Sequence, residues 1–144
     1  MLQPTGACRC GAVRFEAAAE PHFSGYCHCG DCRHATGAPV VAFVGFRADD
    51  VVWQGEPAAH ASPGGLPVER LFCRTCGAPL GYRDARLPDR IYLYTAALDR
   101  PQDHPPRSHS YAGERLHWLA LADDLPQHAA TSVPRPPDRP KDHS

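Results

Sequence analysis

The chain has 144 residues, and its 15 basic and 16 acidic residues leave a formal charge of −1 at pH 7. This length fits one domain, and the charge balance argues against a nucleic-acid partner, since proteins that bind nucleic acids usually carry a basic surface. Residues 1–6 lack the basic and then apolar layout of a signal peptide, and no apolar run is long enough to span a bilayer. We therefore expect a cytoplasmic protein without a membrane partner.

Short strands separated by turn signals follow one another along most of the chain. Residues 12–17 alternate apolar and polar side chains, which is the period of a half-buried strand. Aromatic and β-branched residues predict further strands at 39–46, 51–53, 68–72 and 91–95. One short helix is expected over residues 31–36, and Gly37 is expected to end it. The sequence therefore predicts a mainly β fold with very little helix.

The composition changes near residue 127. From there to residue 144, prolines alternate with charged residues, and large apolar side chains disappear. A segment of this kind cannot bury enough apolar surface to offset the entropy cost of ordering it. We therefore expect a folded domain over residues 1–126 and a flexible, proline-rich charged tail over residues 127–144.

Seven cysteines form the most informative pattern in the sequence. Disulfides are rare in the cytosol, and an odd number of cysteines cannot pair completely within one chain. The cysteines fall into three groups, which are Cys8 with Cys10, Cys27 with Cys29 and Cys32, and Cys73 with Cys76. Two thiolates one or two residues apart can reach the same ion, and tetrahedral thiolate ligands select zinc. The spacing therefore predicts zinc.

The seven ligands can be divided between metal sites in two ways. A structural zinc site takes four protein ligands, whereas a catalytic site takes three and leaves one position open. In the first division, the loop with Cys27, Cys29 and Cys32 forms the open site. The other four cysteines then join the N-terminal strand, which Cys8-Arg9-Cys10 opens, to a distant hairpin. In the second division, Cys29 and Cys32 combine with Cys73 and Cys76 as a zinc ribbon.

Several motifs resemble one known family, the glutathione-dependent formaldehyde-activating family, which includes the domain of centromere protein V. The resemblance covers residues 6–126 and rests on residues 6–15 (GACRCGAVRF), 27–33 (CHCGDCR) with Gly37, 72–77 (FCRTCG) with Leu80, 108–111 (SHSY), Trp118 and 124–126 (DLP). It implies a β-tent, a set of antiparallel sheets with zinc-knuckle loops. It also implies two zinc ions per chain, a structural one on Cys8, Cys10, Cys73 and Cys76 and a catalytic one on Cys27, Cys29 and Cys32.

The activity that the resemblance implies is that of a carbon–sulfur lyase, the addition of glutathione to formaldehyde to give S-hydroxymethylglutathione. Glutathione, or a similar thiol, and a small aldehyde are then the expected partners. Two further hypotheses remain, one within enzymes and one from a different class of protein. The first keeps the same chemistry with a different aldehyde or thiol. The second is a non-catalytic zinc module that binds another protein, as the centromere branch of the family suggests.

The histidines receive plainer interpretations. His28 lies between two cysteines, so its side chain points away from them if the segment is extended, which favours a surface or packing role over proton transfer. His104, His109 and His117 are too widely spaced in sequence to indicate a metal site.

Overall fold

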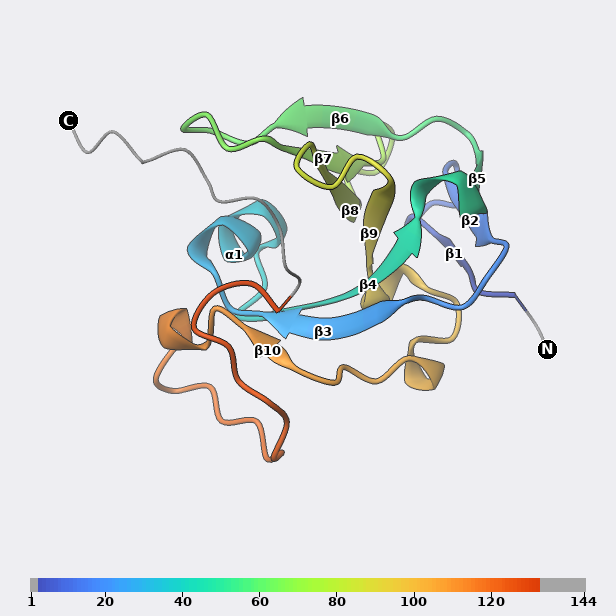
Figure 1. Ribbon diagram of the computed structural model, residues 1–144. Helices are drawn as coiled ribbons and strands as arrows, with labels where there is room; N and C mark the ends of the chain where they lie inside the picture. Colours follow the sequence, from blue (N-terminus) through green and yellow to red (C-terminus); the bar gives the residue numbers. More distant parts are fainter. Residues whose placement is uncertain (1–2, 133–144) are drawn as a thin grey trace.

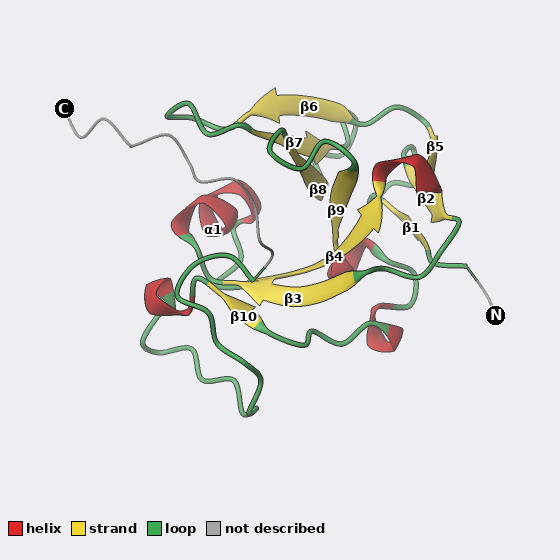
Figure 2. Cartoon of the chain, viewed as in Figure 1, coloured by secondary structure: helices red, strands yellow, loops and turns green. Residues whose placement is uncertain are grey.

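Two β-sheets form the framework of the computed structural model, which describes residues 3–132 (Figures 1 and 2). The smaller sheet has the strand order β1 (Thr5–Ala7), β2 (Arg14–Ala17), β5 (Val51–Gln54). The larger sheet has the order β10 (His109–Ser110), β3 (Phe23–Cys27), β4 (Val41–Arg47), β9 (Arg90–Tyr94), β8 (Pro79–Asp84), β7 (Val68–Phe72), β6 (Ala58–Ala61). Neighbouring strands are antiparallel except β10 and β3, which are parallel. The mainly β prediction is confirmed.

One α-helix, α1 (Gly30–Thr36), occurs in the described part of the chain, together with four short 3-10 turns. The turns are η1 (Ala48–Asp50), η2 (Thr95–Ala97), η3 (Pro101–Asp103) and η4 (Ala112–Glu114). Gly37 ends α1 with a φ of 72°, and its amide donates to the carbonyl of Arg33, as expected of a left-handed helix end. None of the described helices is long and apolar enough to cross a membrane.

The predicted strands correspond to β2, β4, β5, β7 and β9, whereas β1, β3, β6, β8 and β10 were not predicted. Weak strand formers explain several of these omissions. β8 contains Gly81, and a Cβ at this position would lie 2.1 Å from the carbonyl oxygen of Tyr92. Glycine lowers the strand propensity, yet only glycine fits between β8 and β9 here. The expectation that Cys8-Arg9-Cys10 opens the first strand is wrong, because β1 precedes Cys8 and the three residues lie in the β1–β2 loop.

The central strands β4 and β9 separate two clusters of buried side chains. Successive strand residues point to opposite faces, so Val44 and Phe46 join Ile91 and Leu93 in one cluster, which also contains Cys8 and Cys73. Phe43, Tyr92 and Tyr94 lie in the other cluster, together with Cys27 and Cys32. The continuous apolar run of β4 is therefore explained by burial on both faces. Each buried cluster therefore contains cysteines, those of one cluster from two loops and those of the other from a single stretch of chain.

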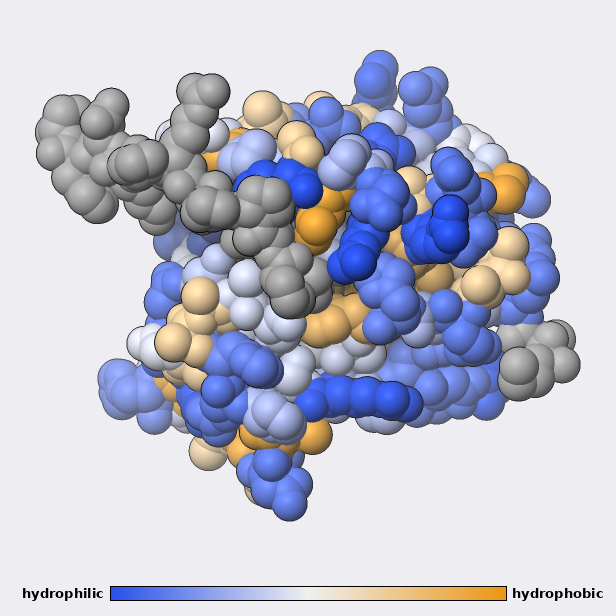
Figure 3. Space-filling view, viewed as in Figure 1, coloured by the Kyte–Doolittle hydropathy of each residue, from blue (hydrophilic) through white to orange (hydrophobic). Residues whose placement is uncertain are grey.

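The segment after residue 126 continues along β10. His109 pairs with Gln127 in a parallel bridge, and the amide of Tyr111 donates to the carbonyl of Ala130 over 2.9 Å. The remaining residues of the expected tail, 133–144, lie outside the described residues. Figure 3 shows a largely hydrophilic face with scattered apolar side chains. Among the described residues, the exposed large apolar side chains are Val52 and Trp118, each 63% exposed.

Candidate metal centres

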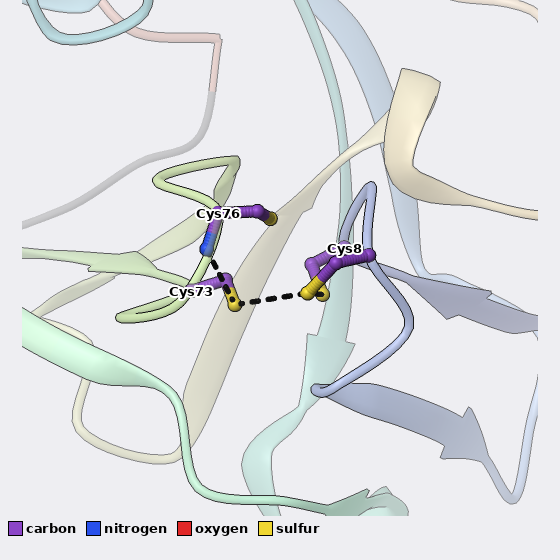
Figure 4. A group of neighbouring side chains, drawn as sticks. Cys8, Cys73 and Cys76 are labelled. Atoms are coloured by element: carbon purple, nitrogen blue, oxygen red, sulfur yellow. Dashed lines mark hydrogen bonds between the residues drawn. The ribbon is translucent and has the colours of Figure 1, made fainter.

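Two loops from distant parts of the sequence bring four cysteines together. Cys8 and Cys10 come from the β1–β2 loop, and Cys73 and Cys76 come from the β7–β8 loop. Their sulfur atoms all lie within 4.8 Å of one another. Figure 4 shows Cys8 of one loop facing Cys73 and Cys76 of the other. We call this group the four-sulfur cluster.

The geometry of the four-sulfur cluster fits zinc. A tetrahedral zinc ion with Zn–S bonds of about 2.3 Å separates its sulfur ligands by about 3.8 Å. The Sγ atoms of Cys8 and Cys10 are 3.6 Å apart, and those of Cys10 and Cys73 are 3.8 Å apart. Backbone amides support two of the sulfurs, since Val13 N–H donates to Cys8 over 3.3 Å and Cys76 N–H donates to Cys73 over 3.5 Å. Within residues 3–132, four thiols and no other ligand group form this cluster, which is the donor set of a closed site.

Glycine shapes the loop on each side of the four-sulfur cluster. Gly11 and Gly77 have φ values of 79° and 77°, a conformation that other residues adopt only with strain. Gly77 also donates its amide to the carbonyl of Cys73 over 2.7 Å, which closes the turn that presents Cys73 and Cys76. Gly11 and Gly77, which follow the two cysteine pairs, therefore shape the tight turns of the two loops.

The second group, the three-sulfur cluster, comes from one stretch of chain. Cys27 ends β3, Cys29 caps the N-terminus of α1, and Cys32 lies in the first turn of that helix. The three sulfur atoms lie within 4.8 Å of one another, and among the described residues no carboxylate, histidine or further cysteine joins them. The structure thus groups the sulfurs as four and three, and Cys29 and Cys32 do not share a cluster with Cys73 and Cys76.

The three cysteines of the three-sulfur cluster differ in burial and in thiol pKa. Cys27 and Cys32 are buried, each 5% exposed, whereas Cys29 is half-buried. Hydrogen bonds from the thiols of Cys27 and Cys32 lower the pKa of Cys29 to about 2, whereas the hydrogen bonds of Cys27 with Cys29 and Cys32 raise the pKa of Cys27. The Cys29 sulfur also accepts the amide N–H of Cys32 over 3.3 Å. Cys29 therefore has the lowest thiol pKa of the three, and it is also the most exposed of the three residues.

All three sulfurs of this cluster line a cavity of about 170 Å³. Aromatic rings of Phe43, Tyr82 and Tyr111 form part of its wall, and Arg70 contributes a guanidinium group. A larger groove, of about 380 Å³, passes the other cluster but touches only one of its cysteines, Cys8, and is lined mostly by alanine and valine. The smaller cavity is the better candidate for chemistry, because ligand atoms and polar groups converge on it.

Arg70 is a site residue that the sequence analysis missed. It lies on β7 and is only 5% exposed, and its guanidinium donates to the sulfur of Cys32. One signal could have revealed it. In the predicted strand 68–72, Arg70 shares the face of Val68, and Val68 is buried in the structure. A charged residue on the buried face of a strand needs a hydrogen-bond or ion-pair partner.

A buried chain of hydrogen bonds lies behind the three-sulfur cluster. His28 and His109 are 0% and 1% exposed, and Nε2 of His28 lies 2.8 Å from Nδ1 of His109. Nε2 of His109 lies 3.0 Å from the carboxylate of Asp123, and this hydrogen bond lowers the pKa of that carboxyl group. Because the Asp123 carboxylate accepts a hydrogen bond from Nε2–H of His109, Nδ1 of that ring is the acceptor for Nε2–H of His28. Of the two roles that the sequence favoured for His28, the structure therefore shows packing. His109 is not the ordinary histidine that its position suggested.

The chain is similar to known proteins over most of its length. The family model described as "Glutathione-dependent formaldehyde-activating enzyme" matches residues 3–114. A curated protein of Halomonas elongata named "Putative glutathione-dependent formaldehyde-activating enzyme" is 32% identical over 126 residues, which cover 81% of this chain and 79% of that protein. A crystal structure of a Rhodobacter sphaeroides protein aligns with a TM-score of 0.51 and 22% identity, over 86% of this chain and 99% of that one. At that identity, the crystal structure supports a likeness of fold alone.

Proposed function

Because this chain belongs to the glutathione-dependent formaldehyde-activating family, we propose that it is a cytoplasmic carbon–sulfur lyase that adds glutathione, or a similar thiol, to formaldehyde or another small aldehyde. In this reaction the thiol sulfur bonds to the carbonyl carbon and the C=O π bond breaks. The thiol proton ends on the oxygen, which gives S-hydroxymethylglutathione and consumes no oxidant or reductant. The proposal assigns a structural zinc to the four-sulfur cluster and a catalytic zinc to the three-sulfur cluster.

The observation that carries this proposal is the difference in ligand number between the clusters. Three sulfurs face a cavity, and the described residues supply no fourth ligand to them. A zinc ion held there would supply Lewis acidity toward the aldehyde oxygen and would lower the pKa of a thiol. Catalytic zinc sites have this composition of three protein ligands and one open position.

The cavity residues contribute binding and exclusion of water. A space of about 170 Å³ suits a small aldehyde next to a thiol group. The rings of Phe43 and Tyr82 pack with Tyr92 behind the cluster, and the rings of Tyr82 and Tyr92 stack at 5.0 Å. Such a rigid wall keeps two reactants close together and reduces competition from water. Because thiols already add to formaldehyde without a catalyst, we expect positioning to account for much of the acceleration.

The test is a direct measurement of hydroxymethylglutathione formation above the spontaneous rate. The metal-loaded protein is expected to accelerate the addition, and removal of the metal by a chelator is expected to abolish the acceleration until zinc is restored. Cys29→Ser is expected to lose the acceleration, whereas Arg83→Gln, a change at a half-exposed arginine paired with Glu69 on the neighbouring strand, is expected to keep it. Equal rates for the parent, Cys29→Ser and a blank would leave a non-catalytic zinc module as the function.

A further inference from the structure

The guanidinium of Arg70 connects β7 to the first turn of α1. Its two terminal nitrogens lie 3.6 and 3.5 Å from the sulfur of Cys32. One of them also donates to the hydroxyl of Tyr94 over 3.0 Å, and the other donates to the carboxylate of Asp31. The Cζ atom lies 4.9 Å from the centre of the Tyr82 ring. The group is therefore held on several sides, and a metal ligand is one of its partners.

A buried guanidinium is costly unless hydrogen bonds and charges compensate for its lost hydration. Asp31 supplies one negative charge, but its side chain is 29% exposed, whereas that of Arg70 is 6% exposed. An ion pair alone could form at the surface with less desolvation. The burial of Arg70 brings its N–H groups to Cys32, so the contact with sulfur is the feature that an ordinary surface ion pair would not need.

The two clusters differ in the donors that reach their sulfurs. In the four-sulfur cluster, the donors described outside the cysteine thiols are backbone amides, among them those of Val13 and Cys76. In the three-sulfur cluster, Cys32 receives a charged donor as well. Hydrogen bonds from ionised donors are roughly twice as strong as neutral ones. They withdraw electron density from a thiolate, and such contacts to metal ligands tune the metal.

We propose that Arg70 is a positioning residue that withdraws charge from the Cys32 thiolate, so that a metal in the three-sulfur cluster stays electrophilic although all its protein ligands are thiolates. Asp31 and Tyr94 orient the guanidinium for this task. Its consequence for catalysis rests on the proposed function, in which the metal must polarise an aldehyde. Its effect on the metal itself does not depend on any activity.

The experiment uses the full chain with zinc in the four-sulfur cluster and cobalt in the three-sulfur cluster. Sulfur-to-cobalt charge-transfer bands report how strongly the thiolates donate. Without the Arg70 hydrogen bonds, the thiolate donates more, so Arg70→Gln is expected to shift these bands to lower energy. Arg70→Lys keeps a charge but not the planar fork, so we expect a smaller shift in the same direction. The control Arg83→Gln is expected to match the parent.

Activity is measured on the same variants with zinc in both clusters. Loss of a contact to a metal ligand typically costs roughly 10- to 100-fold in metal affinity or activity, and we expect Arg70→Gln to fall in that range, with partial rescue in Arg70→Lys. Unshifted bands in a folded Arg70→Gln protein would overturn the proposal. If Arg70→Gln does not fold, the bands of Arg70→Lys decide in the same way. Shifted bands together with a parent that accelerates nothing would overturn the proposed function but support the role of Arg70.

Discussion

The four-sulfur and three-sulfur clusters use the same ligand atom for what we propose are different tasks. The first joins loops that are 63 residues apart at Cys10 and Cys73, whereas the second is contained between Cys27 and Cys32. The first therefore ties the smaller sheet to the β7–β8 hairpin, and the second depends on one strand end and one short helix. Ligand number, chain separation and surrounding donors distinguish the clusters, while the ligand type does not.

The sheet keeps these two environments apart. Cys8 and Cys73 belong to the buried cluster on one face of β4 and β9, and Cys27 and Cys32 belong to the buried cluster on the other face. The predictions below use this separation, beginning with the largest expected effect.

Removing one ligand from each cluster tests most directly whether the two clusters have different roles. Cys76→Ser is expected to abolish the folded state, because apparent binding energies of about 10–16 kcal/mol for structural zinc are comparable to the whole stability of a domain, about 5–15 kcal/mol. Cys29→Ser is expected to stay folded and to hold one metal ion per chain instead of two. Circular dichroism and elemental analysis check both variants. Equal unfolding of the two would show that the clusters do not divide structural and catalytic roles.

A moderate effect is expected from the histidine chain. His109→Phe keeps a ring beside Tyr26, whose ring stacks on His109 at 4.9 Å, but removes the partner of His28 and Asp123. A buried polar group left without its hydrogen bond costs about 1–3 kcal/mol. Urea unfolding should show a loss of this size, and metal exchange should become faster at the three-sulfur cluster only.

The control for the histidine chain is His60→Phe, a change at an exposed residue of β6. Surface substitutions usually stay within about 0.5 kcal/mol, so this variant should unfold like the parent. If His109→Phe unfolds at the same urea concentration as His60→Phe, the hydrogen bonds from His28 through His109 to Asp123 do not stabilise the three-sulfur cluster.

The smallest effect is expected at the glycines that shape the two loops. Gly77 and Gly37 have φ values of 77° and 72°, and a Cβ at either position would meet no atom within 4 Å. The cost of Gly77→Ala or Gly37→Ala therefore comes from the backbone alone, about 1 kcal/mol each. Gly113→Ala, where a Cβ also meets nothing and φ is not positive, should be close to neutral. Unfolding midpoints that rank Gly113→Ala with the other two would contradict this account.

Much of the site could be predicted because its parts are local. The spacing of Cys27, Cys29 and Cys32 lies within one loop, and the Gly37 helix end follows from one residue type. Strands such as β4 and β9 are rich in β-branched and aromatic residues, so they were predicted. β6 (Ala58–Ala61) lacks such residues and forms by pairing with β7, which local propensity cannot reveal.

The sequence by itself determined which cysteines lie close together in each loop and which strands alternate apolar and polar side chains. Both properties depend on neighbours along the chain. Only the tertiary structure decided that Arg70 reaches Cys32, 38 residues away, and that His28 meets His109 across 81 residues. Both pairs consist of buried polar groups that must find hydrogen-bond partners. Arg70 meets Cys32 because the fold brings β7 to the first turn of α1, and His28 meets His109 because β3 and β10 are neighbouring strands. The choice of partner is therefore made by packing rather than by any local pattern.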